Sequence, residues 1–384
     1  MKSTLGDMPV KEMGFAGAAV SACSKPAAER HQGDPLRRFT PTLHTAALPV
    51  MGRTVLLETN SQRILQHLVK LFECYPGSPQ AEPSFVWRIV GQNDVHTSPP
   101  WPQRNGFSDD GLRLAEFGQR NFLAVDIDGR EAIAFVSEGL VEDAPGFTSP
   151  FLDTLFYMTA GSLGLISFTS ACVALGTKGL LVLGPPNQGK TTASYLAAKS
   201  GLTYHADQAT FLEVGSGVLR AWGDFVPVSF RPEALRFLPE LELLTHRFSY
   251  CDFTFYYMDR QKLNTAQAEV VTPVCCVFLE RESASVPRLV PVPEAELSAL
   301  LSENIAFKDD DRFERQRMQV LEALARLPAY RLAYGSDPAI AVPFFHHLLT
   351  THEPPDRSFR DSFDQGPLVA SDGKGWTTKC GVPG

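Results

Sequence analysis

The pattern of apolar and polar positions predicts alternating strands and helices along most of the chain. Near its start, "RTVLLETN" (53–60) is a β-rich apolar run, and "SQRILQHLVKLFECY" (61–75) repeats apolar residues at helical spacing. The first predicts a strand, and the second predicts an amphipathic helix capped by Asn60 or Ser61. The residues that this helix is expected to bury are Ile64, Leu65, Leu68, Val69, Leu71 and Phe72.

Short β-rich runs follow this helix. The Asp128-Gly129 pair between the last two runs predicts a hairpin turn. The segment 93–110 contains Pro99, Pro100 and Pro102 and is expected to be a long loop. The runs that predict strands are "SFVWRIVG" (84–91), "GLRLAEFG" (111–118), "NFLAVDIDG" (121–129) and "EAIAFVSEGL" (131–140).

The second half of the chain alternates between helical and strand-like patterns, which predicts a mixed α/β architecture. No internal repeat is visible in the sequence. The expected helices cover 149–167, a segment after residue 189, 231–241, 293–305, 311–327 and 337–350. The expected strands lie in "ACVALGTKGLLVLG" (171–184, two strands turning near 176–179), around 203–205, 210–214 and 218–222, and at 272–281 and 330–335.

These patterns divide the chain into four parts. Residues 1–40 and 353–384 lack periodicity and are predicted to be disordered tails. Residues 48–145 form a smaller α+β region, and residues 146–352 form a second domain. The role of 48–145 stays open between selecting a substrate, extending the sheet of the second domain, and forming a contact in a homo-oligomer.

Composition and charge exclude several classes of protein. The chain has 384 residues, of which 44% are hydrophobic and 20% charged, and a formal net charge of −8. We expect no nucleic-acid partner, because no block of Lys and Arg occurs. We also expect no membrane span, because no apolar run approaches the roughly 20 residues that one needs. The apolar segment "GFAGAAVSAC" (14–23) has the shape of a lipoprotein cleavage site, but acidic residues precede it, so a cytoplasmic location is predicted.

The seven cysteines fit a reducing compartment. They are scattered, with no C-x-x-C pair, and predict neither a disulfide framework nor a zinc site. Cys275 and Cys276 lie within an apolar strand-like run and are expected to be small core residues.

One short stretch carries candidate chemistry. In "LLVLGPPNQGKTTASYLAAK" (180–199), residues 184–191 match the phosphate-binding pattern G-x-x-x-x-G-K-[ST] between an apolar strand and a helix. The glycines allow backbone N–H groups to approach a phosphate, and the start of the helix favours an anion. Lys190 is expected to reach the β- and γ-phosphates, and the Thr191 hydroxyl to bind Mg²⁺. The predicted nucleotide-binding residues are Gly184, Asn187, Gln188, Gly189, Lys190, Thr191 and Thr192.

Asp207 is the second candidate. It follows the strand-like run "LTYHA", so that its carboxylate is expected at a strand end. There it can bind Mg²⁺ together with Thr191 or accept a proton from a substrate hydroxyl. His205 would share its face at the two-residue spacing of a strand. We therefore predict Asp207 and Lys190 as the catalytic residues.

These motifs resemble a known family. The P-loop, its lead-in "GTKGLLVLG" and an acid 17 positions after Lys190 in "HADQ" are similar to the C-terminal domain of HPr kinase/phosphorylase and its relatives. The resemblance covers about 145–350 and implies a P-loop kinase-like domain of the phosphoenolpyruvate-carboxykinase type. In that fold a mixed sheet is flanked by helices, and here the smaller α+β region precedes it. ATP and Mg²⁺ are the implied cofactors, with Asp207 as general base or metal-linked residue.

The sequence departs from the family pattern at three points. Gln208 stands where relatives carry a second acid, and Thr169 stands where they often have a histidine. The Glu-x-Arg-Gly signature of HPr kinases does not follow Asp207. The implied acceptor is therefore a hydroxyl of another small molecule or peptide rather than HPr.

Three functions follow from these residues. The first is an ATP-dependent kinase, in which Arg231 is either a cation near the transferred phosphoryl group or a solvated residue at a helix start. The second is a nucleotide-binding regulatory or scaffold protein that has lost phosphoryl transfer, which the changes at Gln208 and Thr169 favour. The third is NTP hydrolysis without an acceptor.

Overall fold

The computed structural model describes most of the chain between residues 41 and 378, and most of the predicted tails 1–40 and 353–384 lies outside the described residues. No helix among the described residues is long and apolar enough to cross a membrane. The residues described are 41–73, 75, 82–92, 97–99, 101–102, 105–118, 120–223, 226–244, 246–250, 253–258, 270–282, 286–306, 310–351, 368–371 and 375–378.

The chain divides into two compact units, each of which draws on separate stretches of sequence. The N-terminal unit comprises the described residues of 41–165 and 222–258. The C-terminal unit comprises Ile166–Ala221 and the described residues from 270 onward. The predicted domain 146–352 thus spans segments of both units. Mixed sheets and helices occur in each, so the fold is mixed α/β.

A nine-stranded sheet forms the centre of the C-terminal unit. Its main path runs β11-β9-β10-β17-β13-β12-β8, while β19 pairs with β17, and β18 with β19. Strands β10, β17 and β19 are parallel to one another, whereas β9 and β11 are antiparallel within the sheet. The strands are β8 (Ile166–Phe168), β9 (Ala171–Leu175), β10 (Lys178–Leu183), β11 (Thr203–Ala206), β12 (Thr210–Gly215), β13 (Val218–Trp222), β17 (Val270–Arg281), β18 (Arg288–Pro291) and β19 (Ala329–Tyr334).

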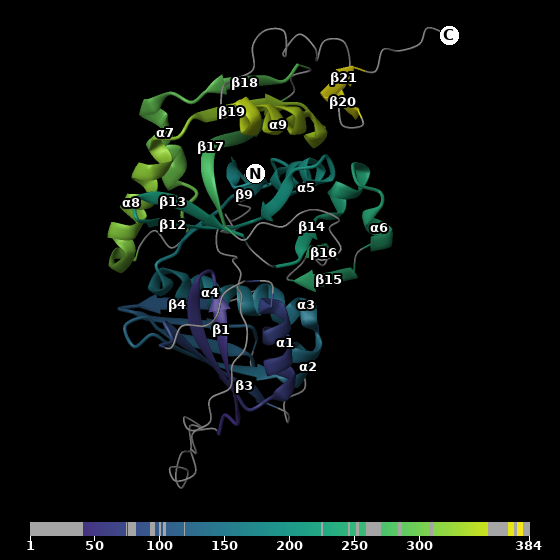
Figure 1. Cartoon of the computed structure of the whole chain (residues 1–384). Helices are drawn as coiled ribbons and strands as arrows, with labels where there is room; N and C mark the ends of the chain where they lie inside the picture. Colours follow the sequence, from purple (N-terminus) through teal and green to yellow (C-terminus); the bar gives the residue numbers. More distant parts are fainter. Residues whose placement is uncertain are drawn as a thin grey trace, which may run out of the picture. The chain divides into compact units, whose positions relative to one another are not determined.

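Helices cover both faces of this sheet because strand β10 is apolar on both sides. Along β10, Leu180 and Val182 pack against α5 and α9, and Leu181 and Leu183 pack in a separate core with α7 and α8. Figure 1 shows the two helix pairs on opposite sides of the sheet. Such continuous apolar runs are typical of parallel strands buried on both faces. The helices are α5 (Lys190–Lys199), α7 (Glu294–Ser302), α8 (Glu314–Ala325) and α9 (Ala341–Thr351).

The N-terminal unit contains a seven-stranded sheet in the order β1-β2-β3-β7-β6-β5-β4. Strands β2, β3 and β7 are parallel, and the other neighbours are antiparallel. The predicted hairpin at Asp128-Gly129 joins β6 to β7. The strands are β1 (His44–Val50), β2 (Arg53–Thr59), β3 (Phe85–Gln92), β4 (Asn105–Asp109), β5 (Leu112–Glu116), β6 (Phe122–Asp126) and β7 (Glu131–Ser137).

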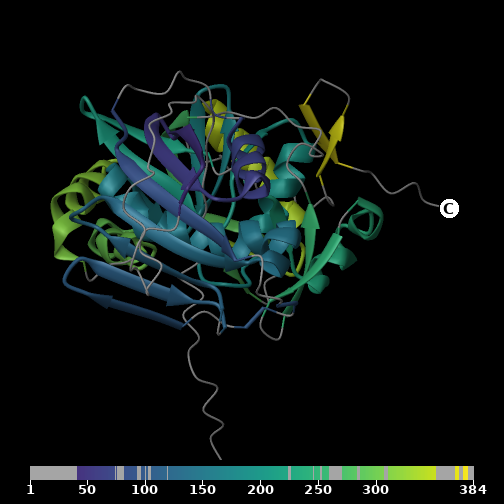
Figure 2. The ribbon, with the colours of Figure 1, turned by 90° about the horizontal axis from the view of Figure 1, so that it is seen from below.

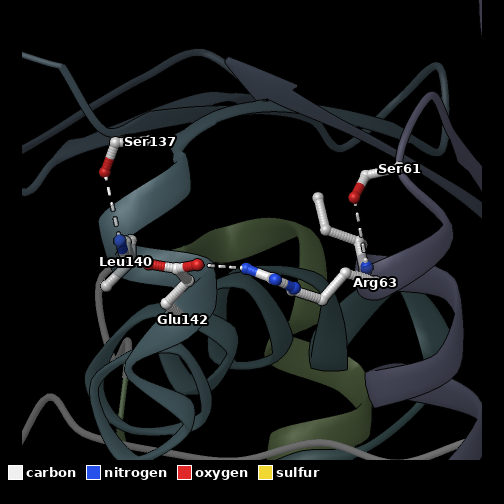
Figure 3. Close-up of polar contacts among 6 residues, drawn as sticks. Ser61, Arg63, Ser137, Leu140 and Glu142 are labelled. Carbon is white, nitrogen blue, oxygen red and sulfur yellow. Dashed lines mark hydrogen bonds and ion pairs between the residues drawn. The ribbon is translucent and has the colours of Figure 1, made fainter. Parts of the chain in front are cut away.

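Helix α1 (Gln62–Phe72) packs on β1 and β2 (Figure 2). Its buried residues are Ile64, Leu68 and Phe72, three of the residues expected to be buried. Its cap is Ser61, whose Oγ accepts a hydrogen bond from the Ile64 N–H at 3.4 Å. Ser137 caps α2 (Glu138–Glu142) in the same way. Figure 3 shows both caps and the exposed ion pair between Arg63 and Glu142, at 2.6 Å, which joins the two helices.

Two sequence predictions within residues 41–165 of this unit were wrong. Residues 105–109 are not part of a loop, because they form β4 and pair with β5 in regular antiparallel register. The predicted helix from Ser149 begins in regular form only with α4 (Asp153–Ala160). The preceding residues, Phe147–Leu152, form an irregular π-helical segment in which Ser149 has the extended angles φ −131° and ψ 109°. A proline disfavours the helical conformation of the residue before it, which accounts for the break at Ser149.

A three-stranded sheet completes the N-terminal unit, in the order β14 (Val228–Phe230), β16 (Phe253–Met258) and β15 (His246–Tyr250). The predicted helix 231–241 is instead a 3₁₀ turn, Pro232–Arg236, followed by the short α6 (Leu241–Leu244). The last described residues form two antiparallel strands, β20 (Leu368–Ser371) and β21 (Gly375–Thr378), which belong to the C-terminal unit.

Candidate functional site

The motif loop lies at the carboxyl ends of three parallel strands. Strand β10 ends at Leu183, the loop follows, and α5 begins at Lys190. Strands β17 and β19, which run parallel beside β10, end at Arg281 and Tyr334. The carboxyl edge of a sheet is the usual location of ligand sites in α/β proteins. The topology therefore gathers residues from three distant stretches of sequence around one loop.

Both motif glycines are required by the shape of the loop. Gly184 has φ +125°, and a Cβ there would lie 2.6 Å from the Leu279 carbonyl oxygen. Gly189 has φ +88°, and its Cβ would lie 2.7 Å from the Tyr334 hydroxyl. Asn187 also has a positive φ, of 66°, which asparagine tolerates better than most residues. The loop thus passes close to the ends of β17 and β19 at its two glycines, which have no side chain.

This packing predicts the stability of a glycine variant. Gly184→Ala is expected to lower the free energy of unfolding by about 3 kcal/mol, because it adds backbone strain to a clash with a carbonyl that cannot move away. The matched control is Gly217→Ala, also at positive φ but with nothing within 4 Å of the new Cβ, which carries the strain alone. Denaturant unfolding of both variants measures the difference. Equal losses would contradict the tight packing of the loop on β17.

Lys190 folds back over the loop. Its Nζ donates hydrogen bonds to the carbonyl oxygens of Gly184, at 2.6 Å, and Pro185, at 3.0 Å. Burial lowers the pKa of this ammonium from 10.5 to about 8, and the nearby Asp207 carboxylate opposes part of that shift. The positive charge is therefore held inside the loop, in a place where it is poorly solvated.

Thr191 and Asp207 are in direct contact. The Thr191 Oγ1 donates a hydrogen bond to Asp207 Oδ1 at 2.9 Å, which joins the first turn of α5 to the end of β11. Asp207 is buried, and burial raises the pKa of its carboxyl group. The contact with Thr191, the backbone N–H of Gln208 and the Lys190 charge act in the opposite direction. The structure thus places three sequence-predicted residues, Lys190, Thr191 and Asp207, in one cluster.

The remaining predicted residues have separate surroundings. Asn187 is exposed at the tip of the loop, and Thr192 is buried in the first turn of α5. The Gln188 side chain is engaged, because its Oε1 accepts a hydrogen bond from the Arg281 backbone N–H at 2.6 Å. The donors of Gln188 that could contact a phosphate are its backbone N–H and its side-chain Nε2.

His205 and Gln208 are also held by the backbone around Asp207. The strand register shifts between Tyr204 and Ala206, so His205 sits at an irregularity, and its Nε2 contacts the Ala221 carbonyl oxygen at 2.9 Å. Gln208 turns the chain directly after Asp207, with φ +62°. His205 is fully buried and is a structural residue of this unit.

Arg281 and Tyr334 are site residues that sequence reasoning missed. The Arg281 Nη2 lies 3.1 Å from the position that a Cβ on Gly189 would take. The Arg281 charge also favours the ionised form of the Tyr334 hydroxyl, and this hydroxyl donates a hydrogen bond to the Gln188 carbonyl oxygen. Burial raises the pKa of Tyr334. A guanidinium thus lies next to the start of α5, where an anion is favoured. The sequence contained one signal for these residues, because each stands at the end of an apolar strand-like run.

Arg231, the cation considered from sequence, belongs to the N-terminal unit. It precedes the 3₁₀ turn Pro232–Arg236, and its guanidinium stacks over the Phe253 ring at 5.2 Å from the centroid.

The donor atoms of the cluster suit one hard cation. In the described part of the chain, no group of three or more His, Cys, Asp or Glu side chains forms a metal site. The Thr191 hydroxyl and the Asp207 carboxylate are adjacent oxygen donors beside a glycine-rich loop. Mg²⁺ is typically held by one or two such protein oxygens together with substrate phosphates and water. The residues therefore fit a phosphate-bound Mg²⁺ rather than a metal held by protein alone.

Comparison with solved structures gives a distant similarity. The structure of the HPr(Ser) kinase/phosphatase from Coxiella burnetii matches with a TM-score of 0.27 and 9% sequence identity, covering 52% of this chain and 94% of that one. No protein-family model matches the chain, and no curated protein matches it. The roles proposed below are drawn from the residues of this chain.

Proposed function

We propose that the C-terminal unit is a P-loop domain of the phosphoenolpyruvate-carboxykinase type that binds ATP with Mg²⁺ and transfers the γ-phosphoryl group to a hydroxyl acceptor. The observation that supports this best is the contact of Thr191 with Asp207 beside the buried ammonium of Lys190. A loop with no ligand role has no need for a poorly solvated cation next to a buried carboxylate, because both cost free energy. Phosphates and Mg²⁺ would satisfy the two charges.

Each residue of the cluster has a role in this proposal. The N–H groups at the start of α5 bind phosphate oxygens, and Lys190 exchanges its bonds to the loop carbonyls for bonds to the β- and γ-phosphates. Thr191 and Asp207 hold Mg²⁺, which when bound neutralises phosphate charge. The Asp207 carboxylate also orients the acceptor hydroxyl and accepts its proton in this proposal.

The alternative function is nucleotide binding without phosphoryl transfer. Gln208 in place of a second acid leaves Asp207 as the single carboxylate predicted for the site, so a nucleotide-binding regulatory or scaffold protein would use the same loop without turnover. We assign the chain to the cytoplasm and its acceptor to small molecules or peptides.

The deciding experiment is incubation of the full-length protein with γ-labelled ATP and Mg²⁺ against a panel of metabolites and peptides. The kinase function is supported if more label is transferred to an acceptor than is released as free phosphate. Release of phosphate alone indicates hydrolysis, and tight binding with neither product indicates the scaffold. Absence of ATP binding at all would overturn the proposal.

The pKa of Lys190 predicts a pH dependence for nucleotide binding. The protonated amine binds triphosphate, so binding raises its pKa above the value of about 8 in the free protein. The affinity gained from this charge is fully present below that pKa and is lost as the pH rises through it, by up to about tenfold per unit. Isothermal titration from neutral pH to about pH 10, in buffers of different ionisation enthalpy, measures both the slope and the proton uptake. Lys190→Met should bind weakly with no such slope, and a flat profile for the unmodified protein would contradict the assignment.

A further inference from the structure

Strand β4 forms an open edge of the seven-stranded sheet (Figure 1). All five of its residues, Asn105–Asp109, are exposed. It pairs with β5 on one side, and no described strand pairs with it on the other. An edge of this kind presents backbone N–H and C=O groups that can pair with another strand.

The other sheet edges are protected in ways that β4 is not. Among strands whose burial the structure describes, β8 and β11 are buried edges, and β1 is largely buried and carries Pro49. Strand β18 carries Arg288 and Pro291, and β15 carries Arg247. Charged residues, prolines and burial are the usual means of preventing edge-to-edge pairing. Strand β4 has neither a basic residue nor a proline, its register with β5 contains no bulge, and its one charged residue, Asp109, is the last of the strand.

The sequence of β4 is complementary to itself. Two copies related by a twofold axis perpendicular to the sheet place side chains of the same face opposite each other. A register centred on Phe107 pairs all five residues, whereas one centred on Gly106 or Ser108 pairs only three. In the register centred on Phe107, the Asn105 amide faces the Asp109 carboxylate of the second copy, and the small Gly106 faces the small Ser108. An amide donor opposite a carboxylate acceptor is a favourable cross-strand pair.

The same register joins two surfaces on which exposed apolar side chains lie among the acidic residues Asp109, Glu116 and Asp126. Phe107 is 56% exposed. Its cross-strand neighbour on β5 is Leu114, and the cross-strand neighbour of Leu114 on β6 is Ala124. Leu112 and Phe122 lie on the same face and are each 43% exposed. Clustered exposed side chains of this size commonly mark an interaction surface. Pairing two β4 strands would bring the two Phe107 rings together.

We propose that this chain forms a homodimer in which β4 pairs antiparallel with β4 of a second copy, centred on Phe107, to give one continuous sheet. The interface is isologous and closed, because the same strand serves on both sides. It is independent of the nucleotide site and of the function proposed for that site, since every residue that carries it belongs to the N-terminal unit.

The first test is sedimentation analysis of the full-length protein over a wide concentration range, with and without Phe107→Lys. The unmodified protein should be a dimer that dissociates on dilution, and the variant should raise the dissociation constant at least about tenfold, because two lysines would face each other across the axis. The control is Leu243→Lys, at a leucine of the same unit that is 88% exposed on α6. A monomer at all concentrations, or equal effects of the two lysine variants, would overturn the proposal.

A charge exchange tests the register. Asn105→Asp sets two carboxylates opposite each other at both ends of the interface and should weaken the dimer. Adding Asp109→Asn restores an amide–carboxylate pair with the partners exchanged, and should recover most of the affinity. Within one chain, Asn105 Nδ2 donates to Glu116 Oε1 at 2.9 Å, and the second change cannot restore that bond. Recovery therefore reports the contact between copies, and its absence while Phe107→Lys still dissociates the dimer would refute the Phe107-centred register.

Discussion

Lys190→Met is expected to weaken ATP binding by at least about 100-fold. The ammonium lies within the loop and is poorly solvated, so bonds to phosphate oxygens replace weak solvation rather than strong hydration. Methionine keeps the length of the side chain and removes the charge. Equilibrium binding of a fluorescent ATP analogue, measured with Mg²⁺, gives the change directly.

The matched control for this variant is on the same helix. Lys199→Met removes an exposed lysine from the last turn of α5, where the ammonium lies over the Tyr195 ring. It should leave binding unchanged, because it is nine positions beyond the loop residue. If both variants bind ATP as the unmodified protein does, the phosphate-binding assignment of the loop is wrong.

Asp207→Asn is expected to reduce phosphoryl transfer by about a thousandfold while ATP binding without Mg²⁺ stays within about twofold. Asparagine keeps the size of the side chain and an oxygen that can accept the Thr191 hydrogen bond, but it has no negative charge and takes no proton. The measurement is single-turnover transfer to the acceptor found by the labelled-ATP panel, beside equilibrium binding of the same variant.

Asp310→Asn serves as the comparison, since Asp310 caps a 3₁₀ turn in the same unit and asparagine caps equally well. It should preserve transfer. If Asp207→Asn changes neither transfer nor Mg²⁺-dependent binding, the aspartate has no chemical role, and the regulatory or scaffold function is favoured.

The part of the candidate site formed by neighbouring residues, the loop with its flanking strand and helix, could be predicted from the sequence. The apolar run before Gly184, the glycine spacing and the helical pattern after Lys190 all depend on neighbouring residues, and the structure has a strand, a loop and a helix in those places. Asp207 was found because it follows a short strand pattern at a familiar distance from the lysine. The ligand roles of these residues stay predictions.

The non-local part was not accessible. Arg281 and Tyr334 reach the loop because β17 and β19 run parallel beside β10, and pairing between strands so far apart leaves no periodic signal in the sequence. Strand β4 was missed for the opposite reason. All its residues are exposed, so it lacks the alternation of apolar and polar positions by which a half-buried strand is recognised.

The discontinuous units have a consequence for synthesis on the ribosome. The N-terminal unit needs residues beyond 221 to finish its core, since the Tyr75 hydroxyl donates to the Gly223 carbonyl oxygen at 2.8 Å. The whole segment Ile166–Ala221 is therefore synthesised before the N-terminal unit can complete its fold. This segment cannot complete its own sheet until β17, the central strand, has been synthesised. Domains generally complete in order as a nascent chain lengthens. Here the two must overlap in time, so a pause in translation between residues 221 and 258 would leave both units incomplete.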